Sequence, residues 1–145
     1  PSLQAFMDRL DAFLDQAPQN FDYAFEIRNP NYLSEAFFNY LKNRKVGCVL
    51  LDGYYMPPIR DIAREFDIHT GKYLVIRLHG PDRSKIEKQT KGLWNDIVKP
   101  KDHSLQAAAT IVQNALQTDI TTVVNVNNHY EGCAPLTIQR LLDLV

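Results

Sequence analysis

The sequence predicts an α/β protein with a parallel β-sheet, and three observations support this fold class. Short segments with the composition of β-strands begin near residues 21, 46, 73 and 121. Segments with apolar residues at helical spacing alternate with them, which is the order of right-handed β–α–β units. The segment Val46 to Leu51 is almost continuously apolar, as expected for a strand buried on both faces of a parallel sheet. This pattern fits either a small open sheet or half of an eight-stranded barrel.

The N-terminal part of the chain is predicted to contain three helices and two strands. A helix comes first and is ended by Pro18, and a strand follows from Phe21 to Ile27. Ser34 is the expected N-cap of the next helix, which precedes the strand at 46–51. Two prolines at 57 and 58 introduce a third helix. The apolar residues that predict these helices are Leu3, Phe6, Met7, Leu10, Phe13 and Leu14, then Ala36, Phe37, Tyr40 and Leu41, then Ile59, Ile62, Ala63 and Phe66.

The C-terminal part is predicted to contain two further strands and three helices. Tyr73 to Leu78 is the third strand, and the β-branched segment Thr121 to Val126 is the fourth. Two helices separated by Pro100 lie between them, and Pro135 opens a last helix. Trp94 is expected in the core as part of its helix stripe. The stripes are Ile86, Leu93, Trp94 and Ile97, then Leu105, Ala108, Val112, Ala115 and Leu116, then Ile138, Leu141, Leu142 and Val145.

The composition is that of one globular domain, and we expect residues 1–145 to form it without an internal boundary. The formal net charge of −1 argues against a purely electrostatic binder of nucleic acid or membranes. Cys48 and Cys133 are isolated and form neither a disulfide framework nor a zinc motif, so a cytoplasmic location is expected. No membrane span or signal peptide is expected, because no apolar stretch approaches the roughly 20 residues that cross a bilayer and charged residues interrupt the N-terminus.

Each predicted strand is followed by ionisable or amide side chains. In parallel α/β proteins the carboxyl ends of the strands meet at one edge of the sheet, where ligands bind. This convergence favours a ligand site over ordinary loop polarity. The candidate residues, strand by strand, are Glu26, Arg28 and Asn29, then Asp52, then Arg77, His79 and Gly80, then Asn127, Asn128 and His129.

Alternation along the strands groups these candidates further. Glu26 and Arg28 point to one side of their strand, and Arg77 and His79 share a side in the same way. If that side is the barrel interior, Glu26 and Asp52 are expected to meet there with the two guanidinium groups. The alternative is a structural ion pair between Glu26 and Arg77, because buried charges must be paired in either case.

The turn after the third predicted strand is a candidate phosphate site. It runs from Gly80 through Pro81 and Asp82 to Arg83, where a helix is expected to begin. Backbone N–H groups at a helix start, with Arg77 and Arg83 nearby, favour a bound phosphate. The lysines that follow are interpreted as a solvated helix face rather than as nucleic-acid contacts.

An aromatic loop and two histidines are further candidates for ligand contacts. The loop at 53–58, with Tyr54 and Tyr55, either stacks on a base or sugar ring or covers the barrel mouth as a lid, and we favour the lid. A divalent metal on His79 and His129 together with the two carboxylates is less favoured, because no HxH or HExxH spacing supports it. No residue is therefore assigned as a metal ligand, and the cofactor is left open.

Three motifs in this order resemble those of the YecE-like family, also called the domain of unknown function 72. Residues 25–30 read FEIRNP and are similar to an E-[FI]-R-[HN]-P element, with Tyr32 near the position of a following aromatic residue. Residues 73–80 read YLVIRLHG and resemble a strand ending in R-x-H-G. Residues 127–135 read NNHYEGCAP and match N-N-H-x-x-G-x-A-P. Asn29 stands where the family more often has histidine.

The resemblance implies a parallel TIM-like (β/α)₈ barrel in which this chain supplies about four β/α units, strands five to eight. The remaining half of the barrel is expected from the same polypeptide or from another chain, because four strands alone leave two exposed parallel edges. The family has no established reaction, so the resemblance implies no activity.

Our leading functional hypothesis is a site that binds or hydrolyses a phosphate-bearing substrate, either a small molecule or a nucleic acid. Whether the chain is an enzyme is left open. A non-catalytic binding or scaffold protein with a structural polar cluster is the first alternative, and a sugar-phosphate isomerase is the second. In the leading hypothesis Arg28, Arg77 and His79 bind the anion, and Gly80 and Arg83 contribute to the phosphate site. The catalytic residues are Glu26, Asp52 and His79. The substrate is oriented by Asn127, Asn128 and His129.

Overall fold

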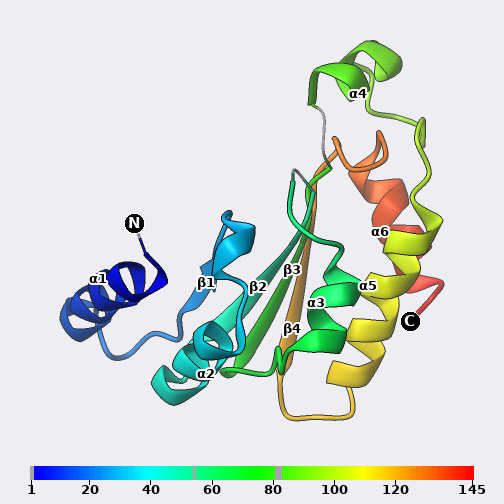
Figure 1. Ribbon diagram of the computed structural model, residues 1–145. Coiled ribbons are helices and arrows are strands. Elements are labelled where there is room, and N and C mark those ends of the chain that lie inside the picture. The colour runs from blue at the N-terminus through cyan, green and yellow to red at the C-terminus, as the bar shows by residue number, and fades with distance from the viewer. Residues whose placement is uncertain (1, 54, 81–82) are drawn as a thin grey trace.

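The computed structural model describes residues 2–53, 55–80 and 83–145, and its elements alternate along the chain as predicted (Figure 1). The helices are α1 (Leu3–Gln16), α2 (Glu35–Arg44), α3 (Ile59–Glu65), α4 (Arg83–Thr90), α5 (Asp102–Ala115) and α6 (Ala134–Leu142), with a short 3-10 helix at Pro30–Tyr32. The strands are β1 (Ala24–Glu26), β2 (Gly47–Asp52), β3 (Tyr73–Leu78) and β4 (Thr121–Val126).

The four strands form one parallel sheet in the order β1-β2-β3-β4. The register places Glu26 beside Val49, Val49 beside Val75, and Val75 beside Val123. Residues paired in this way point to the same side of a sheet, so these four share one face. The connections that follow the strands leave the sheet at one end, which is the upper end in Figure 1.

The other face of the sheet packs against the helices and forms the core. Leu50, Ile76 and Leu78 lie on this face, and each is at most 1% exposed. They belong to one hydrophobic cluster with Phe37 of α2 and Leu105 of α5. Figure 1 shows α3 and α5 side by side in this helical layer.

Cys48 lies on the helix-covered face and is only 3% exposed. Burial raises the pKa of its thiol to about 12, so the side chain is an inert apolar residue, as the sequence predicted. Both cysteines are free and buried.

The face that carries the valine row is not covered by a helix in the part of the chain that the structure describes. Val49 and Val75 are half-buried, and Val123 is 39% exposed. All three lie outside the hydrophobic core cluster. The architecture is therefore an α/β fold with a four-stranded parallel sheet, compatible with a partial α/β barrel.

Local signals explain how two of the elements begin. The Ser34 hydroxyl oxygen accepts a hydrogen bond from the Phe37 N–H at 3.3 Å, which confirms Ser34 as the N-cap of α2. Gly47 opens β2 where the strands approach closely, because a Cβ there would lie 2.3 Å from the Tyr73 carbonyl oxygen. Any side chain at residue 47 would therefore force β2 and β3 apart.

The first strand is shorter than predicted. The sequence indicated a strand from Phe21 to Ile27, but only Ala24–Glu26 pairs, and it pairs with β2 alone. Phe21 is 63% exposed and lies before the strand. An edge strand with one partner forms fewer ladder hydrogen bonds, so its apolar flanks remain outside it.

The prediction that one helix continues to Ile97 was wrong. Helix α4 ends at Thr90, and Lys91, Gly92 and Trp94 all have positive φ, which ends a right-handed helix. Trp94 therefore lies in a loop, where its ring packs edge-on to His129 with 4.9 Å between centroids. Leu93 is 68% exposed instead of buried.

The last helix also buries less than its pattern suggested. Leu141 is buried, but Ile138, Leu142 and Val145 are between 41% and 63% exposed. Helix α6 follows β4, the edge strand on that side of the sheet (Figure 1), so part of its apolar surface has no neighbour among the described residues.

Within the described residues, none of the helices combines the length and the apolar character that crossing a membrane requires.

Candidate functional site

The open face of the sheet carries a cluster of charged residues at the carboxyl ends of the strands. Glu26 ends β1, and its carboxylate accepts a hydrogen bond from Nε of Arg28 at 2.6 Å. Its other oxygen accepts a hydrogen bond from Nη1 of Arg77 on β3. The Glu26 side chain is 16% exposed, against 51% for Arg28 and 34% for Arg77. Together with His79, these residues form what we call the open-face cluster.

The two guanidinium groups control the protonation of Glu26. Partial burial acts to raise the pKa of this carboxyl, but the hydrogen bonds and charges of Arg28 and Arg77 outweigh burial and hold the pKa below its ordinary value. Glu26 is therefore ionised at neutral pH and is a weak proton acceptor. The predicted Glu26–Arg77 pair exists, and Arg28 joins it.

His79 follows β3 and has the same parity as Arg77. Burial lowers the pKa of His79, and the charge of Arg77 lowers it further. A backbone hydrogen bond that involves Gly80 acts to raise this pKa but does not outweigh the other two effects. The imidazole is therefore neutral at pH 7. A neutral imidazole can accept or donate a proton, which an arginine cannot do.

Asp52 does not join the open-face cluster. Its register partner is Leu78, whose side chain is in the core, so Asp52 points to the helix-covered face. There its Oδ2 accepts a hydrogen bond from the Tyr130 hydroxyl at 2.9 Å. The expectation that Glu26 and Asp52 meet is therefore wrong, because the two carboxylates lie on opposite faces. The Asp52 main-chain oxygen still contributes to the strand end by accepting the N–H groups of His79 and Gly80 at 3.0 and 3.3 Å.

Asp52 belongs instead to a second, buried group, which the sequence reasoning missed. Tyr130 is 0% exposed, and Nζ of Lys101 lies 4.3 Å from the centre of its ring. Burial raises the pKa of Tyr130, with the Asp52 charge and hydrogen bond adding to the effect, and burial lowers the pKa of Lys101. Neither residue follows a strand directly, so no strand-end rule points to them.

Glu131 is the most deeply buried acid of this group, at 0% exposed. It accepts hydrogen bonds from the Lys101 N–H at 2.6 Å and the Thr137 hydroxyl at 2.8 Å, and it pairs with Arg140. These contacts join the start of α5 to α6 through the loop after β4. Asp52, Lys101, Tyr130, Glu131 and Arg140 are called the helix-side cluster below.

Of the three predicted substrate-orienting residues after β4, the two asparagines contact their own loop, whereas His129 also contacts α4 and the segment after it. Asn127 Oδ1 accepts the His129 N–H at 2.9 Å and lies 2.6 Å from His129 Nδ1. Asn128 Oδ1 accepts the Ala134 N–H at 2.8 Å, at the start of α6. Nε2 of His129 is 3.4 Å from a Glu87 carboxylate oxygen. The amide side chains of Asn127 and Asn128 therefore stabilise the loop after β4.

The candidate phosphate turn is described only in part. Pro81 and Asp82 lie outside the described residues, as does Tyr54 of the aromatic loop. Gly80 has φ of +86°, and a Cβ there would lie 2.3 Å from the His129 carbonyl oxygen, so the residue must be glycine for β3 and the loop after β4 to pack. Arg83 bonds to Glu87 at 2.8 Å.

The predicted sites do not converge on one metal centre. Among the residues that the structure describes, no three His, Cys, Asp or Glu side chains are grouped so as to hold a metal ion. The less favoured metal interpretation required Glu26 and Asp52 together, and these lie on opposite faces.

Comparison with known proteins agrees with the architecture. The family model described as "Protein of unknown function DUF72" matches residues 1–145. A DUF72 family protein (TM1631) from Thermotoga maritima MSB8 has a similar fold, with a TM-score of 0.64 at 19% sequence identity. The similarity covers 95% of this chain and 50% of that protein, so the chain spans half the length of its structural relative. No curated protein matches.

The family match extends over the whole chain, and the matched structure shares its fold. The chain belongs to the DUF72 family, whose function is unknown.

Proposed function

We propose that the chain forms strands five to eight of a (β/α)₈ barrel whose interior is the open face of the sheet. The sequential parallel order and the helices on one face support this proposal. The exposed edge residues Val123 and Ile138 support it as well, since further strands and helices would cover them. The matched structure also supports the proposal, because it is twice as long as the part it shares with this chain and so has room for four further strands.

We further propose that the open-face cluster binds a small phosphate-bearing molecule. The carrying observation is that two guanidinium groups, from Arg28 and Arg77, converge on one carboxylate at the carboxyl ends of β1 and β3. Arginine binds phosphate oxygens with paired N–H groups, and barrels bind ligands at this end.

The residues of the cluster take different parts in this proposal. Arg28 and Arg77 contact the phosphate, and Glu26 holds the two guanidinium planes in place. His79, neutral at pH 7, is the proton donor or acceptor if a reaction follows binding. Asn127, Asn128 and His129 hold the adjoining loop and face the same ligand from β4. Gly80 and Arg83 border the site.

The scaffold alternative rests on a separate observation. Glu26 is satisfied by both arginines, and the two asparagine amides are engaged within their loop. In that case the polar groups hold the strand ends together and bind nothing.

Calorimetric titration with inorganic phosphate, ribose 5-phosphate and a short single-stranded oligonucleotide separates these cases. We expect the sugar phosphate to bind, and Arg77→Gln to weaken it by about tenfold or more, since a charge-assisted pair is lost. Arg44→Gln is the matched control, because Arg44 pairs with Asp11 and Asp15 far from the strand ends. Binding of the oligonucleotide alone would identify a nucleic-acid site. No binding by the folded, unmutated chain would favour the scaffold.

A further inference from the structure

A groove runs along the outer surface between α3 and α5. It consists of three adjoining hollows of about 150, 360 and 250 Å³ that follow each other along the two helices. The first and second hollows share Arg60, His103 and Ala107. The second and third share Ala63, Ile111 and Asn114. From His103 to Asn114 helix α5 advances about 17 Å, which is the length of the groove along it.

Small side chains produce this groove. Ala63 of α3 and Ala107 of α5 face each other across the seam, and Ile111 forms the buried floor beside them. Alanine fills little of the space between two packed helices, so an elongated hollow with an apolar floor remains.

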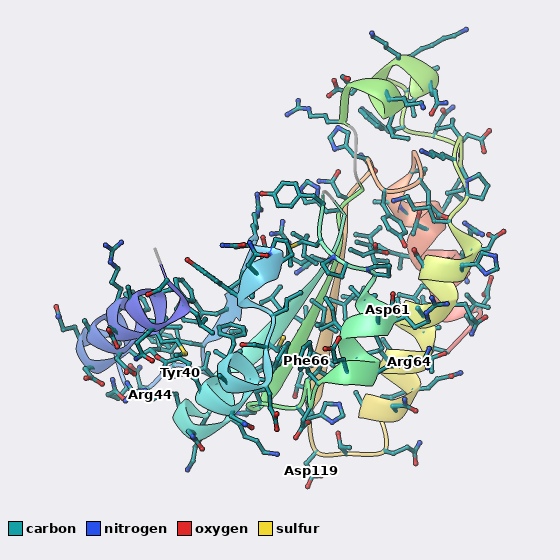
Figure 2. All side chains as sticks on the ribbon, in the orientation of Figure 1. Tyr40, Arg44, Asp61, Arg64, Phe66 and Asp119 are labelled. Atoms are coloured by element: carbon teal, nitrogen blue, oxygen red, sulfur yellow. The ribbon has the colours of Figure 1, made fainter. Side chains whose placement is uncertain are left out.

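The rim that α3 forms carries positive charge. Arg60 and Arg64 lie on the side of α3 that adjoins α5, and Figure 2 shows Arg64 on that side. Glu65 of the same helix lines a different hollow, toward α2. Among the residues that the structure describes, none of those lining the first two hollows is acidic. The third contains Asp67, which pairs with Lys42 at 2.6 Å, so the positive charge of the groove lies at the first two hollows.

Two acidic residues, Asp61 and Asp102, lie near the groove, and neither lines the first two hollows. Arg60 is 3.2 Å from Asp61, but both side chains are about half exposed or more, and exposed pairs of this kind are weak. Asp102, the acid at the start of α5, pairs with Arg140 on the α6 side. The groove therefore presents an apolar floor beside one cationic rim, which α3 forms with Arg60 and Arg64.

The groove is also separate from the surfaces that further barrel strands would cover. The free edges of the sheet are β1 and β4, whereas the groove lies on the outside of the helical layer, in which α3 contacts β2 and α5 contacts β4 (Figure 1). Completion of the barrel leaves this surface exposed.

We propose that the α3–α5 groove binds an acidic amphipathic helix of a partner protein. Helices bind in grooves through apolar residues at i, i+4 and i+7, a spacing that matches three successive hollows. Glutamate or aspartate side chains beside that stripe pair with Arg60 and Arg64. The aliphatic floor favours a peptide over nucleic acid, because among the described residues no Phe, Tyr or Trp side chain lines the first two hollows to stack on bases.

The test is fluorescence anisotropy with the full chain and one labelled probe. The probe is a helical peptide of about 16 residues, with leucines at i, i+4, i+7 and i+11 and glutamates on both sides of that stripe. We expect dissociation constants in the micromolar range, roughly 10–100 μM, for a groove of this size. Arg64→Glu should weaken binding by about tenfold or more, because it replaces attraction with repulsion. Arg9→Glu, an equal charge change at an exposed position of α1, should alter it less than about twofold.

A second variant tests the floor of the groove. Ala107→Trp fills the central hollow and should abolish binding, and its thermal unfolding shows whether the chain still folds. If it does not fold, the Arg64→Glu and Arg9→Glu comparison decides alone. The proposal is overturned if the unmutated chain binds no peptide at about 1 mM, if both charge reversals weaken binding equally, or if a lysine version of the probe binds as well.

Discussion

The open-face cluster and the helix-side cluster occupy the same end of the same sheet, but their environments differ. Glu131 and Tyr130 of the helix-side cluster are 0% exposed, whereas Arg28 of the open-face cluster is 51% exposed. The helix-side groups are paired under the helices that cover them, so their main consequence is for folding. The open-face groups lie where no described helix covers them, and there we propose that a ligand binds. Parity along a strand decides which of these roles a charged residue at a strand end takes.

The largest effect is expected from the buried acid of the helix-side cluster. Glu131→Ala should lower the free energy of unfolding by about 3 kcal/mol, because it removes a buried partner of Arg140 and two further hydrogen bonds. Urea unfolding followed by circular dichroism measures this. Asp102→Ala is the control, since Asp102 bonds to the same arginine but is 74% exposed, and it should cost less than about 1 kcal/mol. Equal losses in the two variants would show that burial does not distinguish the two partners of Arg140.

A smaller loss of stability is expected from Tyr130→Phe. The change removes the hydroxyl that donates to Asp52, leaves the ring in place, and should cost about 1–2 kcal/mol. Anion binding at the open face should stay within about twofold of the unmutated chain, since the two clusters lie on opposite faces. A large loss of binding with unchanged stability would instead place Tyr130 in the ligand site and erase the distinction between the clusters.

The open-face cluster should show a pH dependence that the helix-side cluster lacks. His79 has a lowered pKa and is neutral at pH 7, and an anion bound beside it would raise that pKa. Protonation and anion binding then favour each other, so sulfate, whose charge is constant, should bind about fivefold more tightly at pH 5.5 than at pH 7.5. Calorimetry should show this tightening to be lost in His79→Gln and kept in His103→Gln. Identical pH profiles for the two variants would remove His79 from the site.

The smallest effect concerns the stability that Glu26 contributes. Its pKa is lowered in the folded chain, so its stabilisation is present above its ordinary pKa of 4.5 and is lost as the pH falls through the lowered folded value. Glu26→Gln should therefore cost about 1 kcal/mol at pH 7 and less at pH 3. Urea unfolding at both pH values tests this. A cost that does not change with pH would mean that the ionised carboxylate is not what holds Arg28 and Arg77.

The sequence predicts an element well where the alternation of apolar and polar residues reflects the burial of one face of that element. The third and fourth strands were placed at Tyr73–Leu78 and Thr121–Val126, which are the bounds of β3 and β4. The shared side of Glu26, Arg28 and Arg77 also follows from the two-residue period of a strand. The predicted helix extends beyond the end of α4 because the apolar residues after Thr90 keep a helical spacing. The backbone there has positive φ, which the spacing of apolar residues does not reveal.

The helix-side cluster was not predictable in the same way. The prediction groups Asp52 with Glu26 because both residues end a strand. In the register, however, Leu51 pairs with Arg77 and Asp52 pairs with Leu78, so Asp52 points to the opposite face of the sheet. Its actual partner, Tyr130, lies 78 residues away, and nothing in the spacing of either segment relates them. Long-range polar contacts of this kind depend on how α5 and the loop after β4 pack, which only the folded chain defines.

The central claim is that one end of this sheet separates a ligand-binding face from a face that holds the fold. Amide and side-chain chemical shifts of the isotopically labelled full chain, recorded while inorganic phosphate is added, test it most directly. We predict saturable shifts at Arg28, Arg77 and His79, with the signals of Lys101 and Tyr130 nearly unchanged. Shifts centred on Lys101 and Tyr130, or no saturable shift at either cluster in the folded chain, would contradict the claim.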